Sequence, residues 1–500
     1  MDNIVDANKS RNIDCSSIPE EGSKLYLVAI CFITTIGGFL FGYDTAIISG
    51  CNTFLQAHFQ LGADGLGWAA SSALLGTIAG CLISGILGDG IGRKKTLIIA
   101  SFFLTISALG SMLPPVFLGS PQGFVWFTSD RNTAFNALIV ARIIGGIGVG
   151  ITAAAAPVYI SELTLPGNRG KMISIYQLSI TLGILLAFLV DWVLLSSAGT
   201  AAGVITTDTG AEFLNWIFVQ EIWRGMLGTE IPIAMLFFGL LFLTPESPRW
   251  LVAQGREAEA LSVLTRVGGA TVAAREMYDI RENLKEEKGG IKELFAPHLR
   301  IPLMIGVFLP MFSHLSGIAA IMYFAPNILN EAIQSVESAF LGAVLVGVVN
   351  SAFTFVAITQ IDRYGRRKLL LIGVTGAFVS LAGVGIMFAI GSKLVIIPLL
   401  CYVASFAFSY GPVVWTIIGE IFPTRIRGAA AALGTLSLMI TGFVITLTNP
   451  VLIAKISAAG TFFLYAGLTI PAILFIWKYV PETKGKTLEE IEKIWRNNKR

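Results

Sequence analysis

The chain has 500 residues, of which 54% are hydrophobic and 13% are charged. Soluble domains carry about 25% charged residues, so this composition excludes an ordinary soluble protein and indicates a polytopic membrane protein. The formal net charge is only +3, and the informative property is therefore where the cations lie along the chain.

A transmembrane helix needs roughly 20 apolar residues, and the sequence has room for twelve such runs. The predicted architecture is therefore an all-α membrane protein with twelve transmembrane helices in two six-helix halves. The segment between the halves has helical periodicity and many charges, which favours short amphipathic helices over a flexible linker. The predicted parts are a tail at 1–24, a bundle at 25–244, a linker at 245–300, a bundle at 301–480 and a tail at 481–500.

Gly-, Ser- and Thr-rich stretches at 114–134 and 196–225 are predicted to be external loops. Lys and Arg are frequent in every second connection, including 245–300 and 481–500, and sparse in the others. The positive-inside rule places the cation-rich connections in the cytoplasm. Both termini, the linker and both tails are therefore expected to be cytoplasmic.

Chemical motifs outside transport are missing from the sequence. It contains no nucleotide-binding loop of the G-x-x-x-x-G-K-[ST] type, which argues against ATP-driven transport. It also contains no nucleophile–base pair, metal-ligand cluster or cofactor motif, so we expect neither an enzyme nor a bound cofactor or metal. The five cysteines have no paired spacing and are expected to be free thiols.

A short basic turn occurs once in each half. Residues 84–95 read S-G-I-L-G-D-G-I-G-R-K-K between two apolar runs. Residues 362–368, D-R-Y-G-R-R-K, form a similar basic turn in the second half. Two membrane-length helices joined by so short a turn must form a hairpin. Parallel repeated halves are typical of transporters.

Acids accompany the cations at these cytoplasmic ends. Glu162 and Glu420 each precede an Arg-Gly pair at the same spacing. Cations alone would anchor the loops, but topology does not need acids, so we predict ion pairs that latch the cytoplasmic side and release when the halves move. The predicted gate comprises Asp89, Arg93, Glu162, Arg169, Glu246, Arg249, Asp362, Arg366, Glu420 and Arg427.

Several motifs together resemble the sugar porters of the major facilitator superfamily. They are G-F-L-F-G-Y-D-T at 38–45, R-I-I-G-G-I-G-V-G at 142–150, P-E-S-P-R-W at 245–250, G-P-V-V-W at 411–415, E-I-F-P at 420–423 and P-E-T-K-G-K-T-L-E-E at 481–490. The likeness runs from about residue 25 to 495. It implies the major facilitator fold and alternating-access transport.

Ionisable groups inside a span are costly and are functional candidates by default. Asp44 and Arg142 are expected to face the bundle interior and pair. A carboxylate that alternately pairs with arginine and meets solvent changes its affinity for protons. The resemblance implies proton coupling at Asp44, Arg142 and Glu230, with a purely structural role as the alternative. The family usually has asparagine at the position of Asp191, which we expect to be hydrated and to have no function.

Sugar recognition needs amides, hydroxyls and aromatic faces in a cleft. The resemblance implies binding positions at Gln177, Ser313, His314, Tyr323, Asn350, Gly411 and Trp415. Several amides and one tryptophan that the family offers are replaced: the amides by Ile184, Ser313, His314, Ala319 and Leu438, and the tryptophan by Met439. Losing these groups lowers the expected selectivity for substrate hydroxyls and leaves a more apolar pocket.

The predicted function is proton-coupled symport of a monosaccharide or related polyol into the cell, across the inner membrane of a bacterium. The expected partners are the substrate, a proton and the lipid bilayer, with no nucleic acid, and the protein is expected to be a monomer. A facilitator or symporter of a non-sugar solute such as an inositol or organic acid is the first alternative. A membrane-bound nutrient sensor is more remote, because the charged tail after 480 is short.

Overall fold

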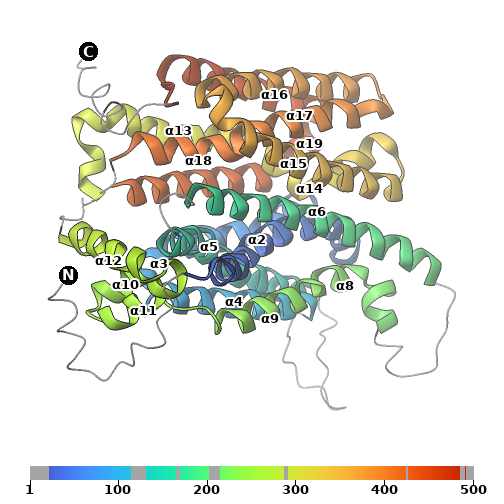
Figure 1. Cartoon of the computed structure of the whole chain (residues 1–500). Helices are drawn as coiled ribbons and strands as arrows, with labels where there is room; N and C mark the ends of the chain where they lie inside the picture. The colour runs from blue at the N-terminus through green and yellow to red at the C-terminus, as the bar shows by residue number, and fades with distance from the viewer. Residues whose placement is uncertain are drawn as a thin grey trace, which may run out of the picture.

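The structure is a computed structural model of the whole chain, shown in Figure 1. It describes residues 22–113, 131–164, 169–201, 214–285, 291–423, 426–484 and 490. All regular elements in these ranges are helices.

The N-terminal half contains five long helices and a sixth that is built from two pieces. They are α2 (Lys24–Phe59), α3 (Ala63–Ile91), α4 (Arg93–Met112), α5 (Arg131–Leu163), α6 (Arg169–Ala201), and then α8 (Ile222–Gly228) with α9 (Glu230–Leu241). The π-helix η3 (Trp216–Gln220) precedes α8. Helix α3 packs on α5, and α2 packs on α6.

Part of the expected loop at 196–225 is helical, so this prediction was wrong for its ends. Helix α6 continues to Ala201, and η3 and α8 begin well before the expected span. Trp223 is buried, and Arg224 Nε forms a 2.6 Å ion pair with Glu221 Oε2. A buried aromatic ring and a local ion pair stabilise a short helix that polar composition alone does not reveal.

The linker forms small helices. They are α10 (Pro248–Ala253), α11 (Glu257–Gly268), α12 (Ala270–Lys285), η4 (Ile291–Phe295) and η5 (Pro297–Leu299). Helices α10, α11 and α12 share an apolar cluster that includes Trp250, Leu264 and Met277. These helices gather at one end of the bundle (left in Figure 1), which we call the linker end. The opposite end, with the turns at 60–62 and 334–335, is called the loop end.

The C-terminal half repeats the six-helix plan with two broken helices. Its elements are α13 (Arg300–Leu315), α14 (Ile318–Ile333), α15 (Val336–Tyr364), α16 (Arg366–Ala389), η6 (Lys393–Val395), α17 (Ile396–Phe408), α18 (Tyr410–Ile421) and α19 (Arg427–Tyr479). The pairs α13–α14 and α17–α18 each form one crossing, interrupted at Gly317 (φ +87°) and Ser409 (φ −122°, ψ −75°).

Helix α19 counts as two crossings. Its 53 residues would extend about 80 Å as one helix, far more than the roughly 30 Å apolar core of a bilayer. The backbone breaks at Ser457 (φ +69°), and Tyr465 Oη lies 3.0 Å from Asn449 Oδ1. That contact requires the chain to fold back on itself. The described chain has 11 apolar helical stretches of membrane-crossing length, and splitting α19 gives the predicted twelve spans.

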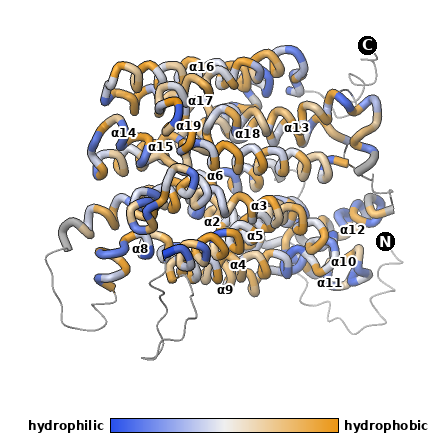
Figure 2. Tube along the Cα trace, turned by 180° about the vertical axis from the view of Figure 1, so that it is seen from behind, coloured by the Kyte–Doolittle hydropathy of each residue, from blue (hydrophilic) through white to orange (hydrophobic). Residues whose placement is uncertain are grey.

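The apolar packing differs between the two ends. Towards the loop end, one cluster joins the halves and contains Tyr43, Phe188 and Trp223 together with Phe324 and Phe340. Towards the linker end, each half has its own cluster, as one runs through α2, α4 and α5 and another through α13, α16 and α18. Hydrophobic residues cover the lengths of the helices and hydrophilic residues gather at the ends (Figure 2), as expected for a membrane-spanning bundle.

Candidate functional site

Three ionisable side chains meet inside the N-terminal half. Asp44 on α2, Arg142 on α5 and Glu230 at the start of α9 are 5%, 2% and 3% exposed. Arg142 Nη1 donates a hydrogen bond to Asp44 Oδ1. Glu230 is near enough to interact electrostatically with both. The structure therefore brings together all three residues that the sequence proposed for proton coupling.

Tyrosines connect this cluster to neighbouring helices. Tyr43 Oη lies 2.7 Å from Thr229 Oγ1, next to Glu230 in the chain, and ties α2 to the sixth span. Tyr323 on α14 lies on the other side, within electrostatic range of Asp44 and Arg142. Because α14 belongs to the C-terminal half, the charged cluster is in contact with both halves.

Three of the candidate sugar ligands have unused polar groups. Gln177 on α6, Asn350 on α15 and Trp415 on α18 make no hydrogen bond to other described residues, and their polar atoms are not among those sealed from solvent. Ser313 is different, because its buried hydroxyl donates to the Pro310 carbonyl at 2.7 Å. The polar atoms of Gln177, Asn350 and Trp415 are therefore accessible to water or a ligand.

His314 lies at the end of α13, against α19. A Cβ atom at Gly442 would lie 2.5 Å from His314 Nδ1, so the glycine is what allows the imidazole to approach α19. Nδ1 is buried and has no hydrogen-bond partner among the described residues. The adjacent break at Gly317 packs on the Tyr465 ring. Gly411, in the first turn of α18, has open space where a side chain would be.

The helix breaks were missed at the sequence level. Tyr402 Oη lies 2.9 Å from the Ser316 carbonyl oxygen and 2.8 Å from Ser316 Oγ, which supports the interruption between α13 and α14. Discontinuous helices are common at transporter binding sites, because they free backbone groups to face a cavity. The dipeptide Ser316-Gly317 was the available signal, since glycine adopts positive φ at little cost.

At the loop end, polar side chains bridge the two halves. Asn52 Nδ2 donates to the Tyr323 carbonyl at 2.7 Å, and Asn327 Nδ2 donates to Thr53 Oγ1 at 3.2 Å. Helix backbones also touch, because a Cβ at Gly67 on α3 would lie 2.2 Å from the Leu447 carbonyl oxygen on α19. The loop end is therefore closed between the halves.

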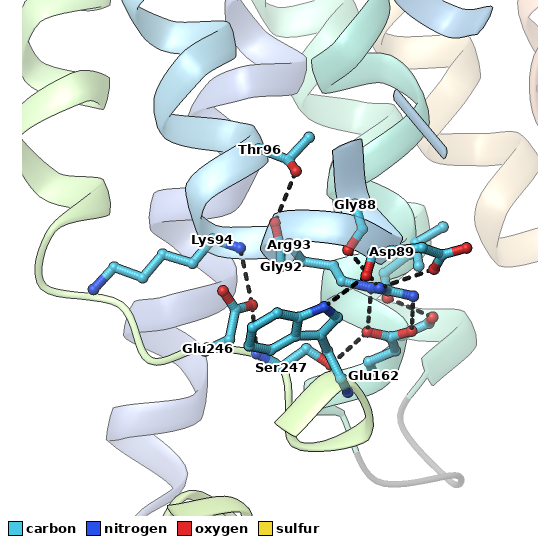
Figure 3. A network of polar contacts seen from close by, with 12 residues as sticks. Gly88, Asp89, Gly92, Arg93, Lys94, Thr96, Glu162, Glu246 and Ser247 are labelled. Carbon is cyan, nitrogen blue, oxygen red and sulfur yellow. Dashed lines mark hydrogen bonds and ion pairs between the residues drawn. The ribbon is translucent and has the colours of Figure 1, made fainter. Parts of the chain in front are cut away.

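The linker end of the N-terminal half carries a dense charged network (Figure 3). Arg93 Nε lies 3.0 Å from Glu162 Oε2, and Arg93 Nη1 lies 3.1 Å from Asp89 Oδ1. Glu246 accepts the Lys94 backbone N–H at 3.0 Å. The side chains thus fix the α3–α4 turn against α5 and the start of the linker.

The C-terminal half repeats this arrangement. Arg366 Nη2 lies 2.9 Å from Glu420 Oε1. Glu482 takes the place of Glu246, since it accepts the Arg366 backbone N–H at 2.9 Å. These ion pairs connect helices within one half. Their role as a gate between the halves therefore stays a prediction.

The remaining gate residues differ in what the structure describes. Arg249 is exposed and forms no ion pair with the described residues. Arg427 donates from Nη2 to the Phe422 carbonyl at 3.5 Å. The side chains of Arg169 and Asp362 lie outside the described residues.

We expect Gly92→Ala to destabilise the N-terminal half. Gly92 has φ +98°, and a Cβ atom there would lie 2.2 Å from Glu246 Oε2. The backbone strain alone costs about 1–3 kcal/mol, and moving Glu246 would also break its bond to Lys94. A lower melting temperature of the purified protein would show this. Gly90→Ala is the matched control, because that site has open space; equal melting of the two variants would contradict the prediction.

Comparisons with known proteins agree with this fold. The family model described as "Sugar (and other) transporter" matches residues 30–495. The arabinose-proton symporter of Bacillus subtilis is 37% identical, over 94% of this chain and 95% of that protein. The D-xylose-proton symporter of Escherichia coli K12 is 34% identical, over 94% of this chain and 96% of that protein.

Solved structures give the same result. The xylose transporter of Escherichia coli, in a partially occluded inward-open conformation, superposes with a TM-score of 0.79 at 32% identity, covering 93% of this chain and all of that one. The fold and its buried charges thus define a multi-pass membrane transporter of the major facilitator type, not an enzyme. The chain belongs to the sugar transporter family.

Proposed function

We propose that the protein is a proton-coupled symporter that carries a monosaccharide or a related polyol into the cell. The observation that carries this proposal is the buried cluster of Asp44, Arg142 and Glu230. Asp44 pairs with the Arg142 guanidinium and Glu230 lies within electrostatic range of both, so the cluster has an excess negative charge when both acids are ionised. Burying a net charge is costly, and one bound proton removes it. The cluster is therefore suited to carry one proton as a coupled unit.

The substrate site is proposed between the halves. Gln177 and Asn350 would bond sugar hydroxyls through their unused amides, and Trp415 would pack on the apolar face of the ring. Ser313, His314, Tyr323 and Gly411 would complete the wall. Two relatives are named for arabinose and D-xylose with a proton, which supports a sugar as the cargo.

The proposed orientation places the linker end in the cytoplasm and the loop end outside, because Lys and Arg concentrate at the linker end. The division into tails 1–24 and 481–500, bundles 25–244 and 301–480, and linker 245–300 is part of this proposal. The protein would lie in the inner membrane of a bacterium, as a monomer, with both termini cytoplasmic.

In that orientation the structure corresponds to an inward-facing state. The halves share hydrogen bonds and an apolar cluster at the loop end, whereas their clusters towards the linker end are separate. Rocking of the halves would open the loop end and close the linker end. The charged networks at Arg93 and Arg366 would then meet the opposite half and act as the gate.

A thermal-shift screen of the purified protein against pentoses, hexoses, inositols, polyols and organic acids, at two pH values, tests the substrate. A ligand that binds the folded state raises its melting temperature by mass action. A shift with one sugar, larger at low pH, supports proton-linked sugar transport. Shifts only with non-sugars would overturn the sugar assignment.

We expect Gln177→Ala to weaken binding of the identified sugar about tenfold, or about 1.4 kcal/mol, because the variant loses a hydrogen bond to the ligand and leaves a ligand hydroxyl unpaired. Titration calorimetry of the purified variant measures the change. Gln254→Ala on the exposed linker is the matched control. Unchanged affinity in Gln177→Ala would remove Gln177 from the site.

The second candidate is a facilitator or symporter of a non-sugar solute. It is favoured by the apolar replacements Ile184, Ala319 and Leu438, and by a relative named as the major myo-inositol transporter of Bacillus subtilis, 32% identical over 95% of this chain. A nutrient sensor would bind ligand without moving it. Uptake into proteoliposomes separates these cases, since a facilitator equilibrates the solute without a pH gradient and a sensor transports nothing.

A further inference from the structure

Asp191 is a buried acid outside the charged cluster. It lies on α6 and is 0% exposed, so the expectation of a hydrated residue was wrong. The physical reason is Gly50 on α2, where a Cβ atom would lie 2.2 Å from Asp191 Oδ2. Without a side chain at Gly50, α2 and α6 approach closely and cover the carboxyl group.

Among the described residues, no cationic side chain contacts Asp191. Neither carboxyl oxygen has a hydrogen-bond partner in that part of the chain. The titratable groups that face it are Tyr43 and Cys51 on α2, both within electrostatic range. Helix α15 presents Gly347 and Ser351 to α6, and neither titrates.

The cations and the other acid nearby are occupied elsewhere. Arg142 on α5 pairs with Asp44, and Arg224 on α8 pairs with Glu221. Glu230 lies beyond Tyr43, in the charged cluster. An ionised carboxylate buried without a partner costs several kcal/mol, whereas the protonated acid carries no charge. Asp191 is therefore stable in this packing as the acid.

Tyr43 on α2 neighbours both Asp191 and the coupling cluster. Tyr43 and Gly50 are seven residues apart on α2, so they lie on one face of the helix, two turns apart. Tyr43 is within electrostatic range of both Asp191 and Glu230, and its hydroxyl contacts Thr229 beside Glu230. Tyr43 is therefore a polar neighbour of both acids.

We propose that Asp191 is a second proton-binding carboxyl group, on the loop-end side of the Asp44–Arg142–Glu230 cluster. It accepts a proton from the loop side during the transport cycle, and it holds that proton as a neutral acid in the closed packing seen here. Only an O–H bond forms and breaks. The role of this proton in transport rests on the proposed symport, but its binding to Asp191 does not.

The test uses Asp191→Asn in the full-length protein reconstituted into liposomes. Infrared spectroscopy over a pH titration should show the carbonyl band of a protonated, buried acid in the wild type. We expect Asp191→Asn to lose this band, Asp44→Asn to retain it, and exposed Asp64→Asn to match the wild type. In uptake assays, Asp191→Asn should shift the external pH at which transport is half-maximal. A shift of one pH unit corresponds to about 1.4 kcal/mol of proton-binding free energy lost in the variant.

Two results would overturn the proposal. One is an unchanged carbonyl band in a folded Asp191→Asn protein, which would show that Asp191 holds no proton. The other is loss of the band with an unchanged pH profile, which would show that the proton on Asp191 takes no part in transport and would overturn the role proposed for it there. Coupled uptake that survives Asp44→Asn would contradict the proposed symport instead, and the infrared band would still report on Asp191.

Discussion

Asp44→Asn should abolish accumulation of the sugar against its gradient. The new amide cannot take up or release a proton, so Arg142 and Glu230 would remain as a neutral pair that needs no proton to be buried. In liposomes with an inside-alkaline pH gradient, we expect the variant to accumulate less than about a tenth of the wild-type amount, since the linkage between proton and sugar is lost. Radiolabelled uptake measures this directly.

Counterflow exchange is the matched measurement. It needs the halves to rock with sugar bound on both sides, but no net movement of protons. The Asp44→Asn variant should therefore exchange labelled for unlabelled sugar while it fails to accumulate it. Accumulation at the wild-type level would contradict coupling at Asp44, and loss of both activities would leave only a structural role for the pair.

Stability must be separated from coupling. Removing one partner of a buried ion pair costs about 3–5 kcal/mol when the other charge is left uncompensated. Here Glu230 lies near Arg142 and can compensate part of that charge. The double variant Asp44→Asn/Arg142→Gln contains no unpaired buried cation. Its melting temperature should therefore exceed that of the double variant Asp44→Asn/Glu230→Gln, in which Arg142 remains charged without either neighbouring carboxylate.

Features that follow from local sequence patterns were predictable. The apolar runs gave the number of spans, and the basic turns with Gly92 and Gly365 gave the two hairpins. Both glycines have positive φ in the structure, as so short a connection requires. The pairing of Asp44 with Arg142 was also anticipated, because an ionisable group within a span must find a partner, whereas the position of Glu230 beside them was not.

Other features depend on contacts between distant segments, which the sequence does not display. Asp191 looked accessible from its place near the end of a span, and only the approach of α2 at Gly50 shows that it is buried. The break at Gly317 rests on a contact between Ser316 and Tyr402, 86 residues away. The closed loop end depends on Asn52 and its partner on α14, 271 residues away.

Gly67→Leu should prevent the loop end from closing. A Cβ atom at Gly67 would lie 2.2 Å from the Leu447 carbonyl oxygen, and backbone cannot move aside as a flexible side chain can. Because Gly67 is on α3 of one half and Leu447 is on α19 of the other, the larger side chain separates the halves. A change of about 5.5 kcal/mol is enough to reverse a 99:1 ratio of closed to open molecules. We expect the steric clash at this contact to disfavour the closed state by an amount of that order.

The expected result is a protein that binds sugar from the loop side but transports almost none. A cysteine placed at Thr53, which contacts Asn327 across the halves, would report the opening. Its labelling by a membrane-impermeant maleimide should be slow in the Thr53→Cys protein and fast when Gly67→Leu is added. Gly85→Leu on the same helix is the control, because open space surrounds Gly85. Normal transport by Gly67→Leu would show that the closed loop end seen here is not an obligatory state of the transport cycle.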